Sequence, residues 1–239
     1  MMSMIEYRRQ VSEVRIAEER YTINLIRMSI MWTAASFCLY LLQYMNKYLS
    51  GTIFINYYLD GVAGVLAVIF GQILFNWLKT KWSYVFSYTT TLLGSIGIFI
   101  FEAGFISPYF IDSMGCPPSD YPEGSEKDRE YHLKRIIPYF TFLAKIGVNL
   151  TMQFTYYVSF NDPKTFPLVK RTTAIGICNF IARFVTIFSP LIAEIDRPIP
   201  ILIVIIVTTI GLITSFTFPS IEDDRQEAQS IQDSISKQN

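Results

Sequence analysis

Apolar residues are gathered in long runs that are separated by shorter polar segments. A helix needs about 20 mostly apolar residues to cross a bilayer, and a run of about 18 or more is the usual sign of one. Ile201–Phe218 is such a run and contains no charged residue. The pattern predicts an all-α integral membrane protein with six spans. They are Ile23–Tyr44, Thr52–Leu78, Trp82–Phe101, Ile136–Val158, Thr172–Ile192 and Ile199–Phe218.

The polar segments divide the chain into three parts. Residues 1–21 mix apolar and charged positions, and they predict a surface segment that forms a weakly amphipathic helix. Residues 22–218 are expected to form the six-helix membrane domain, with a long outer loop at residues 102–135. Residues 219–239 are polar and acidic, and they predict a solvated tail.

Basic residues gather on one side of this topology. The N-terminal segment is rich in arginine, the turn after the second span holds Lys79 and Lys81, and the turn after the fourth span is also basic. The opposite side has the net acidic loop at residues 102–135. The positive-inside rule then places both termini on the cytoplasmic side, or on the matrix side of a mitochondrion. The sequence leaves the membrane open between the mitochondrial inner membrane and the plasma membrane.

Composition agrees with a membrane protein and narrows the function. Of the 239 residues 51% are hydrophobic, and the formal net charge of zero gives no reason to expect a nucleic-acid partner. The three cysteines and the single histidine have no metal-ligand spacing. Neither a nucleophile motif nor a phosphate-binding glycine loop is present. We therefore expect no enzyme, no cofactor and no metal site, and we expect membrane lipids as neighbours.

Three ionisable residues lie inside the predicted spans, where charge is costly and by default suggests a function. Asp60, Lys145 and Arg183 each lie roughly 12 to 14 Å below the outer membrane boundary, at a helical rise of 1.5 Å per residue. They could therefore meet in one layer and form a net positive substrate-binding site for a small organic anion. The alternative is that Asp60 pairs with Lys145 or Arg183 only to hold the bundle together.

Four segments resemble one transporter family. Lys170–Pro190, KRTTAIGICNFIARFVTIFSP, resembles the penultimate helix of organic-ion transporters of the major facilitator superfamily, whose pattern is close to R-x-T-G-x-G-x-C-x-x-x-A-R-x-x-x-x-x-x-P. The matching residues are Arg171, Thr173, Gly176, Cys178, Ala182, Arg183 and Pro190. WTAASFCLY, IFINYYLDG and LAKIG resemble the seventh, eighth and tenth helices of that family, in the same order.

The resemblance implies the C-terminal half of that fold, with six helices of which the first, second, fourth and fifth face a central cavity. It also implies that Arg183 occupies a position where anion transporters tend to have arginine. The signature D-R-x-G-R-R that follows the family's eighth helix reads NWLKTK here, so Asn76 replaces its acid and Lys79 its glycine. This signature normally pairs charges during gating.

Two functions remain open. Alternating access needs two halves that rock around a site at the membrane midplane, and this chain supplies one. The first hypothesis is a structural or accessory subunit of a larger membrane complex that has lost autonomous transport. The second is a half-transporter that pairs with itself, or with a separate N-terminal half, to carry small organic anions.

Overall fold

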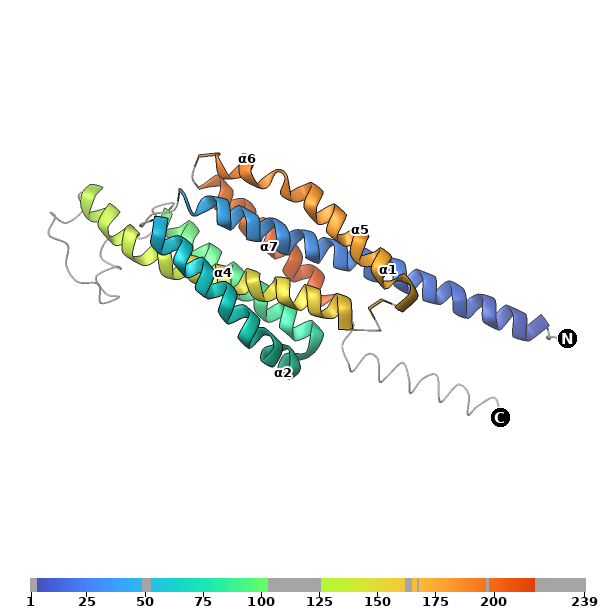
Figure 1. Ribbon diagram of the computed structural model, residues 1–239. Helices are drawn as coiled ribbons and strands as arrows, with labels where there is room; N and C mark the ends of the chain where they lie inside the picture. Colours follow the sequence, from blue (N-terminus) through green and yellow to red (C-terminus); the bar gives the residue numbers. More distant parts are fainter. Residues whose placement is uncertain are drawn as a thin grey trace.

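The computed structural model describes residues 4–48, 53–102, 126–161, 165–166, 168–196 and 198–217. The described residues are all-α, and the helices lie side by side in an elongated bundle (Figure 1). The elements are α1 (Met4–Met45), α2 (Ile53–Glu102), α4 (Glu126–Asn161), α5 (Leu168–Thr186), α6 (Ser189–Ala193) and α7 (Ile199–Phe216).

Four helices are long and apolar enough to cross a membrane, so the prediction of an integral multi-pass membrane protein is confirmed. These candidate spans are Tyr21–Met45, Phe54–Phe101, Val169–Ala193 and Ile199–Phe216. Large apolar side chains lie on the outside of the bundle, as they do in a protein that is solvated by lipid; Val169, for example, is 94% exposed. The predicted fourth span lies in α4 and is not among the four candidates, because Lys145, Asn149 and Gln153 interrupt its apolar run.

The chain reverses within α2. Lys79 has φ 62° and ψ 179°, which separates a first segment (residues 53–78) from a second segment (residues 80–102). Near the start of the first segment, the Asn56 amide donates to the Asn46 carbonyl, 3.3 Å away, beyond the end of α1. At its far end the second segment shares a buried cluster with Met45. Both outer ends of α2 therefore lie beside the same end of α1, and Figure 1 shows the two segments as a hairpin. The reversal lies between the predicted second and third spans.

α4 packs between the two segments of α2. It runs parallel to the first segment, where the Phe75 ring packs against the Tyr157 ring at a tilt of 56°, with ring centroids 4.4 Å apart. It runs antiparallel to the second segment and approaches it closely at two glycines. A Cβ at Gly94 would lie 2.7 Å from Ala144 Cα, and a Cβ at Gly147 would lie 2.5 Å from the backbone nitrogen of Thr91. Small residues allow this backbone contact, as they do in other membrane helix pairs.

Two buried apolar clusters follow one another along the bundle. The Leu41 cluster surrounds the C-terminal end of α1 and includes Phe37, Leu41, Met45, Ile98, Ala144, Val148, Ile201 and Val204. The Trp32 cluster lies nearer the N-terminal end of α1 and includes Met28, Met31, Trp32, Tyr84, Leu150, Phe154, Cys178 and Ala182. α1 contributes to both clusters, and it packs against α4, α5, α6 and α7. α1 is therefore the central helix of the bundle.

Helices extend into two segments that the sequence predicts to lie outside the spans. Residues 4–20 are helical, but they continue α1 and project from the bundle along its axis (Figure 1). Residues 126–135, predicted as part of the outer loop, form the first turns of α4. The predicted tail at residues 219–239 and the loop at residues 103–125 lie outside the described residues. The predicted fifth span is divided into α5 and the short α6.

Candidate functional site

Asp60 and Lys145 form an ion pair between the first segment of α2 and α4. The Lys145 Nζ and Asp60 Oδ1 atoms are 3.1 Å apart. The Lys145 side chain is only 1% exposed and that of Asp60 is 15% exposed. One turn further along each helix, the Cβ position of Gly64 lies 4.0 Å from Asn149 Oδ1. The parallel course of the two helices therefore brings two residues 85 positions apart in the sequence into direct contact.

The pair removes most of the cost of two charges in the middle of the bundle. An isolated ammonium in an apolar interior loses its hydration with no compensation, whereas a paired one gains Coulomb energy at low dielectric. Asp60 is the one charged partner that Lys145 has among the described side chains. The two groups together carry no net charge, so they cannot attract an organic anion by charge alone.

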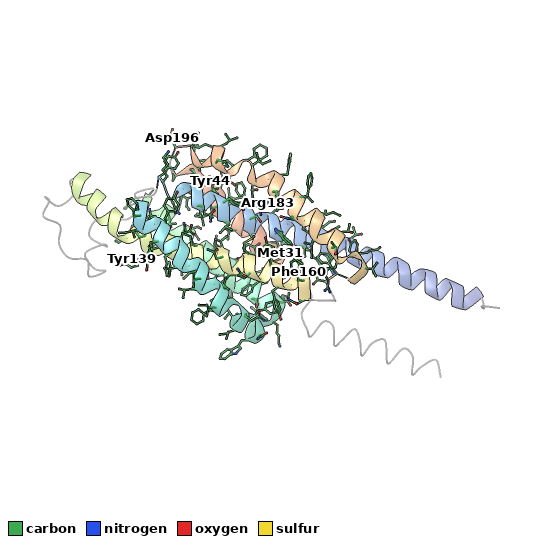
Figure 2. The ribbon with its side chains drawn as sticks, in the orientation of Figure 1. Met31, Tyr44, Tyr139, Phe160, Arg183 and Asp196 are labelled. Atoms are coloured by element: carbon green, nitrogen blue, oxygen red, sulfur yellow. The ribbon has the colours of Figure 1, made fainter. Side chains whose placement is uncertain are left out.

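Arg183 makes a different contact. Arg183, labelled in Figure 2, lies on α5. Its guanidinium donates a hydrogen bond to the hydroxyl of Tyr40 on α1. The guanidinium carbon also lies 5.5 Å from the centre of the Tyr40 ring, within the range of a cation–π interaction. In the part of the chain that the structure describes, Arg183 makes no ion pair and its side chain is exposed.

The three predicted site residues thus divide into a neutralised pair and a separate cation. Both groups lie at the boundary between the two buried clusters. Lys145 follows Ala144 of the Leu41 cluster and precedes Leu150 of the Trp32 cluster. Ala182 belongs to the Trp32 cluster, while Val185 packs on the Leu41 cluster. The positions of Lys145 and Arg183 between the two clusters are therefore consistent with the common depth that the sequence predicts for the three residues. Arg183, however, bonds to Tyr40 and not to Asp60.

Polar residues continue from Arg183 along one exposed face of α5. Thr172, Gly176, Asn179 and Arg183 are three or four positions apart, so they form one stripe. All four are exposed, and a Cβ at Gly176 would meet nothing within 4 Å. The neighbouring exposed face of the same helix carries large apolar side chains, among them Phe184. We call the stripe, together with Tyr40, the polar face.

A small polar cavity lies near the Trp32 cluster, between the first segment of α2 and α4. It encloses about 240 Å³ and is lined by Gln72, Gln153, Tyr157 and Asn161, among others. Sequence reasoning did not single out these residues, nor did it single out Tyr40. Uncharged polar residues give no clear functional signal in the sequence of a span. Their role can be assessed only once the structure shows which residues of the neighbouring helix they contact.

Known proteins provide no family assignment for this arrangement. Comparisons of the chain with family models, with curated proteins and with solved structures found no match. What stands from sequence and structure together is an all-α, multi-pass membrane protein with a buried ion pair and an exposed arginine on a polar helix face.

Proposed function

We propose that this chain is an accessory subunit of a larger membrane assembly, and that its polar face packs against another membrane protein. The observation that carries the proposal is the exposed Arg183, in the middle of a membrane-spanning helix and on the same stripe as Asn179. A guanidinium that faces lipid at this depth is costly, so such residues face protein or a water-filled cavity. A partner that covers the polar face would remove this cost.

The proposal includes six spans. The candidate span Phe54–Phe101 has 48 residues, which at 1.5 Å per residue is about 72 Å, more than twice the roughly 30 Å of a hydrocarbon core. Its reversal at Lys79 supports two crossings, and α4, held between them, would supply another. With α1, the α5–α6 pair and α7, the total is six.

Two observations support a likeness to the C-terminal half of a major facilitator transporter. Lys79 has a positive φ that is usually restricted to glycine, and the family pattern has glycine at this position. Asp60, Lys145 and Arg183 lie on the helices that correspond to the second, fourth and fifth of that half. The fold likeness remains part of the proposal, as does any loss of transport.

The second candidate function is a half-transporter for small organic anions. It rests on charge: Arg183 has no acidic partner among the described side chains, so the mid-membrane layer keeps one net positive charge. In this case a second six-helix unit would enclose the polar face around an aqueous cavity. The ligand would bind at Arg183 and Tyr40, while the Asp60–Lys145 pair would hold the cavity wall.

Site-specific photo-crosslinking tests the proposal. A photoreactive phenylalanine analogue replaces Asn179 on the polar face or, as the matched control, Phe184 on the apolar face of the same helix. We expect a protein adduct from position 179 and a lipid adduct from position 184. A stoichiometric adduct with a different membrane protein supports the accessory subunit.

A self-adduct, together with organic-anion uptake that Arg183→Gln abolishes in proteoliposomes, would favour the half-transporter. A lipid adduct from position 179 in the native membrane would overturn both functions, because the polar face would then be uncovered.

A further inference from the structure

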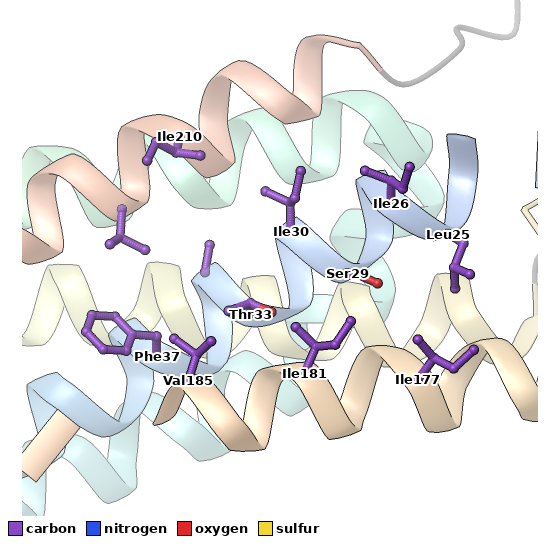
Figure 3. Close-up of a pocket in the computed structure, with 12 residues that line it drawn as sticks. Leu25, Ile26, Ser29, Ile30, Thr33, Phe37, Ile177, Ile181, Val185 and Ile210 are labelled. Atoms are coloured by element: carbon purple, nitrogen blue, oxygen red, sulfur yellow. The ribbon is translucent and has the colours of Figure 1, made fainter. Parts of the chain in front are cut away.

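An apolar groove runs along α1, and neither Asp60 nor Lys145 lines it. α1 forms its floor, and α5 and α7 form its walls (Figure 3). It encloses about 550 Å³, and Leu25, Ile30 and Phe37 of α1 line it together with Ile177 and Ile181 of α5 and Ile210 of α7. Such a groove within candidate membrane spans is filled from the lipid phase or by protein.

The length of the groove matches one leaflet. Leu25 and Phe37 are separated by twelve positions, which at 1.5 Å per residue corresponds to about 18 Å. Half of a hydrocarbon core is about 15 Å thick. The groove begins near the N-terminal end of the candidate span Tyr21–Met45 and reaches slightly beyond its middle. Along the membrane normal, the groove is therefore about as long as one acyl chain.

Phe37 and Val185 line the far end of the groove, and both pack in or on the Leu41 cluster. A helix from a partner protein would cross the whole bilayer and has a diameter of about 10 Å with its side chains, so it would not be expected to stop at this level. A single flexible hydrocarbon chain that enters from one surface fits a groove that ends at this level.

The near end of the groove lies at the level expected for lipid headgroups. The Lys170 Nζ atom lies 5.2 Å from the centre of the Tyr21 ring, and aromatic and basic residues together are typical of the membrane–water interface. Arg27 is half-buried just beyond this level and has no hydrogen bond or ion pair among the described residues. Arg27 follows Ile26 and precedes Ser29, both of which line the groove, and it is three positions from Ile30 on α1.

We propose that the groove between α1, α5 and α7 holds one acyl chain of a phospholipid from the leaflet nearer the N-terminal end of α1, with its phosphate bound by Arg27. The chain is surrounded by branched aliphatic side chains on three sides, and the arginine supplies a charge-assisted contact to the phosphate. This lipid is therefore held longer than the lipids that contact the exposed outer faces. The lipid site does not involve the polar face, so its test is independent of the test of the proposed function.

A photoactivatable phosphatidylglycerol with a diazirine in its acyl chain tests the site in nanodiscs that contain the full chain. We expect labelling to concentrate on peptides that contain Ile30 and Ile181. Native mass spectrometry of the delipidated protein should then retain one phospholipid. Ile30→Trp places an indole ring in the groove, where it takes the space of the acyl chain. Photolabelling and lipid retention should therefore both fall about tenfold, which corresponds to about 1.4 kcal/mol of binding free energy. Val65→Trp is the control, because Val65 is 59% exposed on α2 and lies outside the groove.

Two further variants secure the result. Ile181→Trp fills the groove from the opposite wall and should reproduce the effect if Ile30→Trp proves unstable. Arg27→Gln should lower lipid retention about tenfold while leaving the thermal unfolding of the protein unchanged, as expected for the loss of one charge-assisted contact. Equal labelling in the folded groove variants and in Val65→Trp would overturn the proposal, as would the absence of any retained lipid in the wild-type protein.

Discussion

The contact between Asp60 and Lys145 links two helices through a buried ion pair, and its energetic role follows from its depth. Each charge alone would be exposed to a low-dielectric interior, whereas the pair at 3.1 Å is compensated. The contribution of the pair to stability is therefore small compared with the cost of breaking it. The two side chains are best regarded as one unit.

A double-mutant cycle measures this unit. Lys145→Met should lower the free energy of unfolding by about 3 kcal/mol, because it leaves the half-buried Asp60 carboxylate without its counter-charge. The double variant Asp60→Leu/Lys145→Met should recover most of this loss, since two apolar side chains of similar volume need no compensation. Thermal or denaturant unfolding in detergent micelles provides the measurement. If the double variant were as unstable as Lys145→Met, the two residues would not act as a pair.

The sequence alone indicated which residues are unusual but not which of them touch. The depths of Asp60, Lys145 and Arg183 follow from counting residues along helices of known rise. The choice between Lys145 and Arg183 as the partner of Asp60 depends on how the helices are placed around the bundle. Tyr40, which accepts the hydrogen bond from Arg183, carries no signal of its own in the sequence.

At the scale of elements, the contact of α4 with the second segment of α2 depends on small residues. The backbones approach so closely at Gly147 that a Cβ would lie 2.5 Å from the Thr91 nitrogen and 2.8 Å from the Ser87 carbonyl oxygen. These are backbone atoms, which cannot move aside as the end of a flexible side chain can. The packing of these two helices thus requires glycine at this position.

Gly147→Ala should destabilise the protein, although alanine is by itself the better helix former. The propensity gain is about 1 kcal/mol, and the cost of overpacking is about 1 to 3 kcal/mol, so the melting temperature should fall. Gly64→Ala is the matched control in the neighbouring helix, because its nearest neighbour would be Asn149 Oδ1 at 4.0 Å. We expect the control to unfold at the same or a higher temperature. A gain in stability for Gly147→Ala would contradict the close helix contact.

The turn at Lys79 leads to a prediction of opposite sign. A residue with a side chain at φ 62° and ψ 179° is strained by about 1 to 3 kcal/mol, and the turn is held by the Ser83 hydroxyl, which donates to the Lys79 carbonyl. Lys79→Gly should therefore raise the melting temperature. Lys81→Gly, two positions away in regular helix, should lower it by the helix cost of glycine, about 1 kcal/mol. Equal losses in both variants would show that Lys79 is not strained.

On the scale of the whole molecule, the reversal in α2 decides the topology. If Phe54–Phe101 crosses the membrane twice, Lys47 and Lys81 lie near opposite surfaces. If it were a single tilted span, Lys81 would be buried in the hydrocarbon. The number of membrane crossings therefore depends on the short turn at Lys79.

Cysteine labelling in sealed vesicles distinguishes these topologies. In a background where Cys38, Cys116 and Cys178 are replaced, Lys47→Cys and Lys81→Cys should react with a membrane-impermeant maleimide from opposite sides. Lys81→Cys should share its side with a tag on the N-terminus, because two crossings, α1 and the first segment of α2, lie between these two positions. Failure of Lys81→Cys to react from either side would contradict two crossings by α2.

The sequence by itself determined that this is a multi-pass, all-α membrane protein, since the length and apolarity of a helix are local properties. It also predicted that Asp60, Lys145 and Arg183 lie near one depth. Only the tertiary structure decided that Lys145 pairs with Asp60, that Arg183 reaches Tyr40, and that a lipid-sized groove lies between α1, α5 and α7. The physical reason is that depth is counted along one helix, whereas partners and grooves depend on the rotation and packing of several helices at once.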